Sequence, residues 1–171
     1  MNRRTWFVAA AAAGAAGIGT ALWHSRLSEP SAEAQMIWGL KFEKPSGGEL
    51  VLANFLGNPL LLNFWATWCP PCVTEMPLLD QFQKQEQARG WQVVGLAIDN
   101  AGAVQEFLLK HPVGFAIGLA GTEGVALSRA LGNVGGALPF SVVFDRRGKT
   151  VRTKLGRVHE KELADWAAAM G

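Results

Sequence analysis

The feature that most constrains this chain is a Cys-Pro-Pro-Cys segment placed between an apolar run and a helical pattern. Residues 60–66 are almost continuously apolar, as is typical of a strand buried on both faces. Helical periodicity follows over residues 71–89 and ends at Gly90. Prolines fit the first helical turn because its N–H groups have no partner within the helix. The segment therefore predicts a buried strand that leads directly into a helix, with both cysteines at the junction.

The two cysteines are predicted to form a redox pair. Cys69 would lie at the helix start, where unpaired N–H groups and the positive end of the helix dipole lower the pKa of a thiol. Cys72 follows one turn later, at a spacing that permits a small disulfide ring. We expect Cys69 to be the exposed, attacking sulfur and Cys72 to be the shielded, resolving one.

Two structural roles for the pair are disfavoured. A zinc site needs a second pair of ligands, but the chain has no other cysteine, and His24, His111 and His159 lie far apart. A structural disulfide across so short a loop gains little loop-closure entropy. We therefore expect a redox-active disulfide, no metal and no other cofactor. The pair Gly135-Gly136 predicts a turn, since it does not form a phosphate-binding loop after a strand.

The rest of the chain alternates between strand and helix patterns. Strands are predicted at 37–42, 49–55, 91–98, 115–119, 140–144 and 150–155, and helices at 103–110, 125–131 and 160–170. Residues 145–148 are predicted to form a hairpin turn. This order predicts one α/β domain over residues 37–171, with a mixed sheet covered by helices on both faces.

The N-terminal segment has the composition of an export signal or membrane anchor. A pair of arginines precedes 18 uncharged residues at positions 6–23, a length near the minimum for crossing about 30 Å of hydrocarbon. We assign residues 1–26 to a signal anchor and residues 27–36 to a tether. Cleavage after Ala34 and twin-arginine export are the alternatives. In each case the basic end stays in the cytoplasm and the C-terminal domain is exported.

Charge argues against a nucleic-acid partner. Sixteen Lys and Arg against 14 Asp and Glu leave a net charge of +2, too small a bias to indicate such binding. Basic residues nevertheless gather near the C-terminal end: Arg146, Arg147, Lys149, Arg152, Lys154, Arg157 and Lys161. We interpret this group as the solvated face and protected edge of the hairpin, with a partner-docking patch as the alternative.

The string W-A-T-W-C-P-P-C-V-T-E-M-P at residues 65–77 resembles the active site of thioredoxin-like proteins. It is most similar to that of the membrane-anchored thiol–disulfide oxidoreductases of the TlpA/ResA family, and the resemblance covers residues 37–170. It implies a thioredoxin-like α/β fold, with a central mixed sheet flanked by helices. It also implies a place at the periplasmic face of the bacterial inner membrane, or in the periplasm if the signal is cleaved.

The resemblance also implies further site residues. Pro77 matches a helix-kinking proline, and Pro139 matches a proline that follows a cis peptide bond and faces the disulfide. The substrate groove is assigned to Trp68, Pro70, Pro71, Leu138 and Pro139.

A third catalytic residue is assigned to Glu75, where TlpA/ResA-like proteins carry a glutamate implicated in proton handling. Cytoplasmic thioredoxins instead bury an aspartate six residues before the first cysteine, and here that place holds Asn63, which cannot titrate. We expect the pKa of Glu75 to be raised by burial near Cys72. The alternative is an ordinary solvated acid on the helix.

The function predicted from these residues is a membrane-tethered periplasmic disulfide reductase. Its substrates would be disulfide-containing proteins, and a transmembrane thiol donor of the DsbD kind would return it to the reduced state. An oxidase or isomerase is the alternative, because the potentials of C-x-x-C proteins span roughly −270 to −120 mV.

Three other functions are weighed against it. Peroxide-reducing relatives place a threonine three residues before their reactive cysteine, where this chain has Ala66. A non-enzymatic binding module is the remaining class. Specialists for cytochrome c maturation of the CcmG kind carry an acidic residue right after the cis-proline, where this chain has Phe140-Ser141. This departure argues against a dedicated role in that pathway but does not exclude one.

Overall fold

The computed structural model describes residues 36–170. Its strands are β1 (Lys41–Glu43), β2 (Glu49–Val51), β3 (Leu60–Trp65), β4 (Gln92–Ala97), β5 (Ala116–Leu119), β6 (Phe140–Phe144) and β7 (Thr150–Leu155). Its α-helices include α3 (Pro70–Glu86), α4 (Ala101–Lys110), α5 (Glu123–Ala130) and α6 (Glu160–Ala169), and the short 3₁₀ helices are η1 (Leu52–Phe55) and η2 (Gln87–Arg89).

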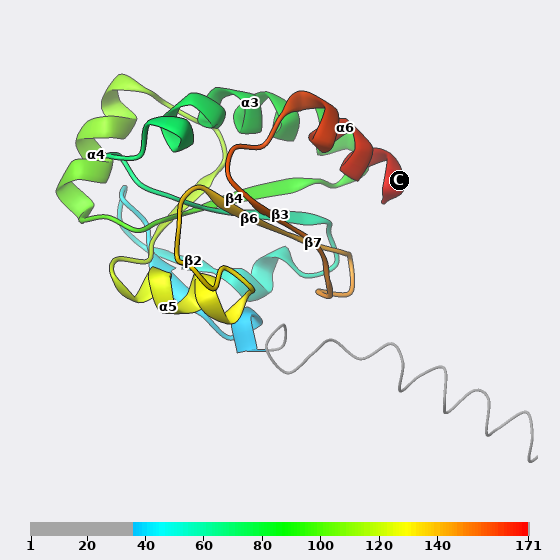
Figure 1. The fold of residues 1–171 in the computed structure, drawn as a ribbon, viewed down its shortest axis with the longest axis horizontal. Coiled ribbons are helices and arrows are strands. Elements are labelled where there is room, and N and C mark those ends of the chain that lie inside the picture. The colour runs from blue at the N-terminus through cyan, green and yellow to red at the C-terminus, as the bar shows by residue number, and fades with distance from the viewer. Residues whose placement is uncertain (1–35, 171) are drawn as a thin grey trace, which may run out of the picture.

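The strands form one seven-stranded mixed sheet in the order β2-β1-β5-β4-β3-β6-β7. The central strands β3, β4 and β5 run parallel to one another. The β6–β7 hairpin pairs antiparallel to β3, and the β1–β2 hairpin pairs antiparallel to β5. This is the predicted thioredoxin-like α/β fold, with a mixed central sheet flanked by helices (Figure 1).

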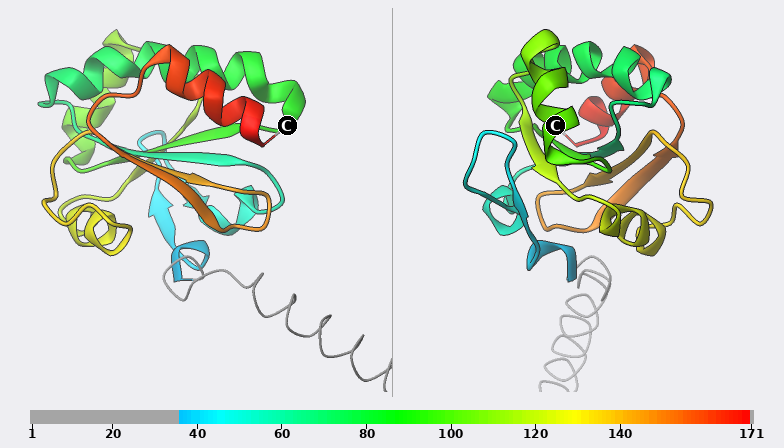
Figure 2. Two further views of the ribbon diagram at one scale, coloured as in Figure 1. Left: turned by 45° about the vertical axis from the view of Figure 1, so that its right-hand side comes forward. Right: turned by 90° about the vertical axis from the view of Figure 1, so that its left-hand side faces the viewer.

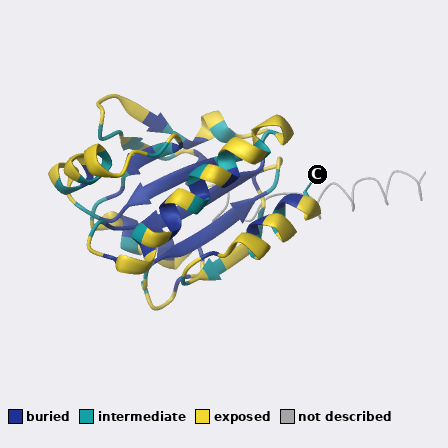
Figure 3. Ribbon diagram, turned by 90° about the horizontal axis from the view of Figure 1, so that it is seen from above, coloured by how far each residue is buried: buried dark blue, intermediate teal, exposed yellow. Residues whose placement is uncertain are grey.

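Helices cover both faces of the sheet. In Figures 1 and 2, α3, α4 and α6 lie on one side, whereas α5 and η1 lie on the other. Strand β3 shows how each face is filled, because Leu61 and Trp65 pack with the α3 side while Leu60, Leu62 and Phe64 pack with the opposite side. Figure 3 shows the central strands buried beneath the half-exposed helix layer. Strand β3 is therefore buried along its whole length, as its apolar run predicts.

Two predicted strands at the start of the domain are wrong in extent. Residues 36–38 are helical, and only Lys41–Glu43 forms β1. The second strand ends at Val51 and continues as η1. Ile37 and Trp38 are buried in the hydrophobic cluster on the α5 side. Their apolar character thus comes from packing against the sheet, which a local strand pattern cannot distinguish from strand pairing.

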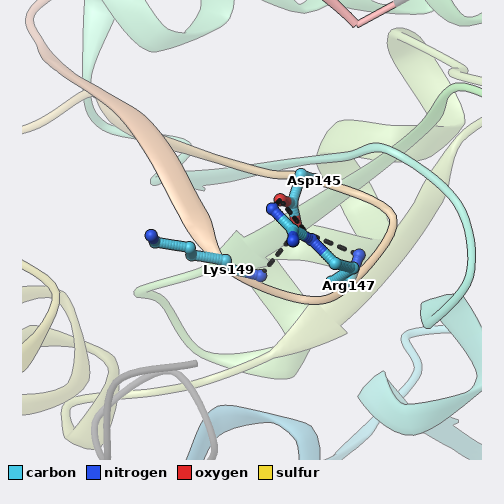
Figure 4. A network of polar contacts seen from close by, with 3 residues as sticks. All are labelled: Asp145, Arg147 and Lys149. Atoms are coloured by element: carbon cyan, nitrogen blue, oxygen red, sulfur yellow. Dashed lines mark hydrogen bonds and ion pairs between the residues drawn. The ribbon is translucent and has the colours of Figure 1, made fainter. Parts of the chain in front are cut away.

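The predicted hairpin turn between β6 and β7 is confirmed. The Oδ1 atom of Asp145 accepts hydrogen bonds from the backbone N–H groups of Arg147 (2.9 Å) and Lys149 (3.0 Å), and its Oδ2 atom pairs with Arg147 (Figure 4). The Trp38 indole N–H donates to the carbonyl oxygen of Gly148 at 3.1 Å. Gly148 has a φ of +76°, and a Cβ there would meet Trp38 at 2.6 Å. The turn therefore requires glycine for both its conformation and its contact with Trp38.

The predicted signal anchor at residues 1–26 lies outside the described residues, as does the tether apart from Met36. Within residues 36–170, no helix combines the length and apolarity needed to cross a membrane.

Candidate active site

The two cysteines form a disulfide where β3 leads into α3. The sulfur atoms of Cys69 and Cys72 are 2.03 Å apart. Cys69 is the N-cap of α3, and its Sγ atom accepts a hydrogen bond of 3.3 Å from the backbone N–H of Cys72. Pro70 and Pro71 open the helix, where their missing N–H groups leave no intrahelical bond unmade. The helix start thus directs an N–H donor and the positive end of its dipole at the Cys69 sulfur.

The two cysteines differ less in burial than expected. Cys72 is fully buried, and Cys69 is only 4% exposed. Our prediction of an exposed Cys69 is therefore wrong in degree. Both residues belong to the hydrophobic cluster between the sheet and α3. The capping contact accounts for this placement, because it turns the Cys69 side chain over the first turn of the helix.

Asp99 holds the loop that precedes Cys69. Its Oδ2 atom accepts hydrogen bonds from the backbone N–H and the hydroxyl of Thr67, at 3.0 and 2.5 Å. Strands β3 and β4 are parallel neighbours, so their carboxyl ends meet at the same edge of the sheet. Our sequence reasoning missed Asp99. A carboxylate two residues beyond the end of the neighbouring parallel strand is the signal that could have found it.

Glu75 lies on the second turn of α3 and is completely buried. One carboxylate oxygen accepts a hydrogen bond from the Asn63 side-chain amide (2.7 Å), and the other accepts from the backbone N–H of Val158 (2.8 Å). Burial raises the pKa of Glu75 to about 7, although the two hydrogen bonds and the positive charge of Arg157 oppose this rise. The alternative of a solvated helix acid is therefore wrong, and the expected rise in pKa is present.

Asn63 connects Glu75 to the strand that follows Pro139. Its side-chain amide also donates to the hydroxyl of Ser141 at 3.0 Å, and both residues are buried. The two residues are direct partners in the β3–β6 register, although 78 positions separate them in the chain. Sequence reasoning noted that Asn63 cannot titrate and missed its contacts, because the pairing of β3 with β6 is not visible locally.

The residues assigned to the substrate groove come from two segments at one edge of the sheet. Trp68 is 66% exposed, and Pro70 and Pro71 are also exposed beside the disulfide. The peptide bond between Leu138 and Pro139 is cis. Leu138 packs against the hydrophobic cluster that contains both cysteines. Leu138 also packs against the cluster on the α5 side, and β6 begins opposite Phe64, near the end of β3. The structure therefore brings the predicted groove residues to the end of the sheet that carries the disulfide.

The cysteine pair has no metal-ligating neighbours of the usual kind in the described part of the chain. Among residues 36–170, no group of three or more His, Cys, Asp or Glu side chains is arranged to hold a metal ion. The absence of a metal and of any other cofactor stays a prediction.

Residues 30–170 match the family described as Redoxin. The chain belongs to the redoxin family. This redoxin is 32% identical over 124 residues to the "Thiol-disulfide oxidoreductase ResA" of Bacillus anthracis, covering 68% of this chain and 66% of that protein. It is also similar to the solved structure of a putative thiol:disulfide interchange protein DsbE from Chlorobium tepidum, with 29% identity and a TM-score of 0.68 over 77% of this chain and 93% of that one. The structure of MTB DsbF matches with 26% identity and a TM-score of 0.69, over 84% of this chain and all of that one.

These similarities confirm the resemblance drawn from the motif. The redoxin is a TlpA/ResA-like thiol–disulfide oxidoreductase and therefore a redox enzyme. Its substrates are disulfide-containing proteins, and its Cys-x-x-Cys pair is the Cys69–Cys72 disulfide.

Proposed function

We propose that this redoxin is a membrane-tethered periplasmic disulfide reductase in which Cys69, Cys72 and Glu75 carry out the chemistry. The observation that carries the proposal is the buried Glu75 carboxyl, three residues after Cys72 on the same helix, with a pKa of about 7. Residues three apart on a helix are neighbours on its surface. A proton acceptor that titrates near neutral pH therefore adjoins the cysteine that must lose a proton.

The reaction is two successive thiol–disulfide exchanges. The Cys69 thiolate attacks a substrate disulfide, forms a mixed disulfide with one sulfur and releases the other as a thiolate. Cys72 then loses its proton and attacks the Cys69 sulfur, which releases the second substrate thiolate. Two electrons pass to the substrate, and the enzyme is left with the Cys69–Cys72 disulfide.

Glu75 takes the proton of Cys72 in the second exchange. Burial raises the pKa of a thiol, so the fully buried Cys72 needs a base for its attack. The two N–H donors from Asn63 and Val158 hold the carboxyl in place and stabilise its ionised form. Cys69 needs no such base, because the start of α3 favours its thiolate.

Reductase rather than oxidase activity is supported by the same carboxyl. Strongly oxidising disulfide proteins owe their potential to a stabilised reduced form with a low-pKa thiolate. A negative charge buried close to the pair opposes the accumulation of that thiolate. Electrons would return from a transmembrane thiol donor of the DsbD kind, and the N-terminal segment would hold the domain at the outer face of the inner membrane. Cytochrome c maturation is the pathway that we include in this proposal.

Trapping tests the assignment of the two cysteines. A Cys72→Ala variant, expressed in cells as the full chain, should accumulate mixed disulfides through Cys69, because the resolving thiol is gone. A Cys69→Ala variant is the matched control and should accumulate none. Identification of apocytochrome c among the trapped proteins would support the maturation pathway. Adducts formed equally by both variants would contradict the assignment.

The reduction potential of the disulfide tests the direction of electron flow. Equilibration of the Cys69–Cys72 pair with a dithiol buffer should give a value near the reducing end of the range from about −270 to about −120 mV. A value near the oxidising end would instead support the oxidase alternative.

A further inference from the structure

An exposed arginine stands beside the cis-proline. Arg157 lies between two residues whose backbone N–H groups are both bound at the site. Gly156 donates to the carbonyl oxygen of Pro139 at 2.8 Å, and Val158 donates to Glu75 at 2.8 Å. The charge of Arg157 also lowers the pKa of Glu75. The β7–α6 loop thus carries an exposed arginine between its backbone contacts with Pro139 and Glu75.

A second arginine approaches from the loop that leads to the cis-proline. Arg129 is exposed near the end of α5, and its guanidinium lies over Gly136, three residues before Pro139. A Cβ at Gly136 would meet the Nε and one terminal nitrogen of Arg129 at 3.3 and 3.4 Å. Gly136 has a φ of +66°, so glycine permits both the turn and this close approach. Arg129 therefore lies against the loop that leads to Leu138 and Pro139.

Neither guanidinium is neutralised within the described structure. Among residues 36–170, no carboxylate lies within ion-pair distance of Arg129 or Arg157. The two carboxylates of the site do not form ion pairs with these arginines. Asp99 accepts hydrogen bonds from Thr67, and Glu75 is buried. The positive end of the α3 dipole adds to the same field. The two loops that meet at the cis-proline thus each carry a positive charge that the described residues do not pair.

We infer that the groove selects protein disulfides whose cysteines are flanked by acidic side chains, which pair with Arg157 and Arg129. This inference rests on the proposed function and names the substrate class of that site. An extended substrate segment can pair with the backbone beside Pro139, while Trp68 and Val134, which are 66% and 85% exposed, offer apolar contacts. Each guanidinium can bind a carboxylate through two parallel hydrogen bonds. Opposite charges also raise the rate of encounter.

The test uses three peptides that differ only beside one cysteine. Each carries that cysteine in a disulfide with a small fluorescent thiol, and the two flanking residues are both Glu, both Gln or both Lys. Rates with the reduced enzyme are divided by rates with dithiothreitol, a neutral thiol, to remove intrinsic differences between the peptides. We expect the Glu peptide to exceed the Lys peptide about fivefold to tenfold in kcat/KM at low ionic strength, mainly through KM. The preference should shrink at roughly 0.5 M salt.

Variants of the full chain identify the responsible charges. Arg129→Gln combined with Arg157→Gln should bring the Glu/Lys ratio to about one, and replacement of both by Glu should favour the Lys peptide. Arg152→Gln removes an exposed arginine from β7 and should keep the parent ratio. The ratio is the readout because it cancels any effect of Arg157 on Glu75 that is common to all three peptides.

Two outcomes would count against the inference in different ways. Equal rates for the three peptides, or a preference that survives the double substitution, would overturn it and leave the proposed function standing. Failure of the enzyme to reduce any of the peptides would overturn the proposed function and this inference with it.

Discussion

The two faces of the central strands differ in the side chains that they bury. On the α5 side, β3 and β6 bury an entirely apolar set of side chains: Leu60, Leu62, Phe64, Phe140, Val142 and Phe144. On the α3 side, the alternate positions of the same strands include Asn63 and Ser141. The Asn63 amide donates hydrogen bonds to the Ser141 hydroxyl and to the buried Glu75 carboxylate. Neighbouring residues in one strand therefore serve packing on one face and a polar site on the other.

The difference shows how this fold accommodates a reactive centre. A buried polar group destabilises a protein unless it has hydrogen-bond partners, so Glu75 and Asn63 are tolerated because β6 and the β7–α6 loop supply those partners. The apolar face has no such requirement and supplies free energy of unfolding through packing. The two faces should therefore respond differently to substitution.

The largest effect on stability is expected on the apolar face. Phe64 is fully buried, and its ring centroid lies 6.1 Å from that of Phe140. Phe64→Ala should lower the free energy of unfolding by about 3–5 kcal/mol, because it removes buried area and leaves a cavity. Urea unfolding of the oxidised protein measures this change. The reduction potential of the disulfide should stay near the parent value. A large shift in this potential would contradict the proposal that one face serves packing and the other serves the redox site.

The next effect concerns pH and the polar face. The pKa of Glu75 is raised from 4.5 to about 7 in the folded protein, so the folded state binds its proton more tightly than the unfolded state does. The contribution of Glu75 to stability is therefore full below pH 4.5, falls as the pH rises towards 7 and is lost above it. The fall from this group should reach about 3 kcal/mol.

Glu75→Gln should remove that fall while it leaves the first exchange with substrate intact. Resolution of the mixed disulfide should slow by about 100-fold, because the base for Cys72 is lost. Unfolding between pH 4 and 8 and single-turnover kinetics measure the two effects. Glu160→Gln, at the exposed start of α6, is the control and should keep the parent behaviour. Superimposable pH profiles for the Glu75 variant and the parent would end its assignment as a proton acceptor.

A smaller effect is expected at Asn63. Asn63→Ala removes a hydrogen bond that lowers the pKa of Glu75, so that pKa should rise further and the resolution step should require a higher pH. The lost contacts should lower the free energy of unfolding by about 1–3 kcal/mol. Single-turnover rates across pH 5–9 measure the shift. In a Glu75→Gln background the same substitution should cause no shift of the profile, and a shift that persisted there would show that Asn63 acts independently of Glu75.

The smallest effect on stability is expected at the exposed rim of the site. Trp68→Ala should change the free energy of unfolding by less than about 0.5 kcal/mol, because its side chain is largely in water. The KM for a peptide disulfide should nevertheless rise, by roughly fivefold if Trp68 anchors the substrate. Steady-state kinetics and urea unfolding together test this prediction. A large loss of stability with an unchanged KM would assign Trp68 to packing instead of binding.

Local patterns in the sequence determined the framework of the molecule. The apolar run of β3, the prolines that open α3 and the glycine that ends the helix region specify their own conformations, because each acts within a few residues. The β6–β7 hairpin was predictable for the same reason. The cysteine pair at the junction of β3 and α3 was therefore placed correctly before any tertiary contact was known.

Only the tertiary structure decided which side chains surround that cysteine pair and how they contact one another. Glu75 meets Asn63 and Val158, and Asn63 meets Ser141, because separate segments come together across 12, 83 and 78 positions of the chain. Such partners depend on strand order and register, which local periodicity does not encode. Burial likewise depends on what covers a residue, and this is why a glutamate that could have been a solvated helix acid became a buried acid with a pKa near neutrality.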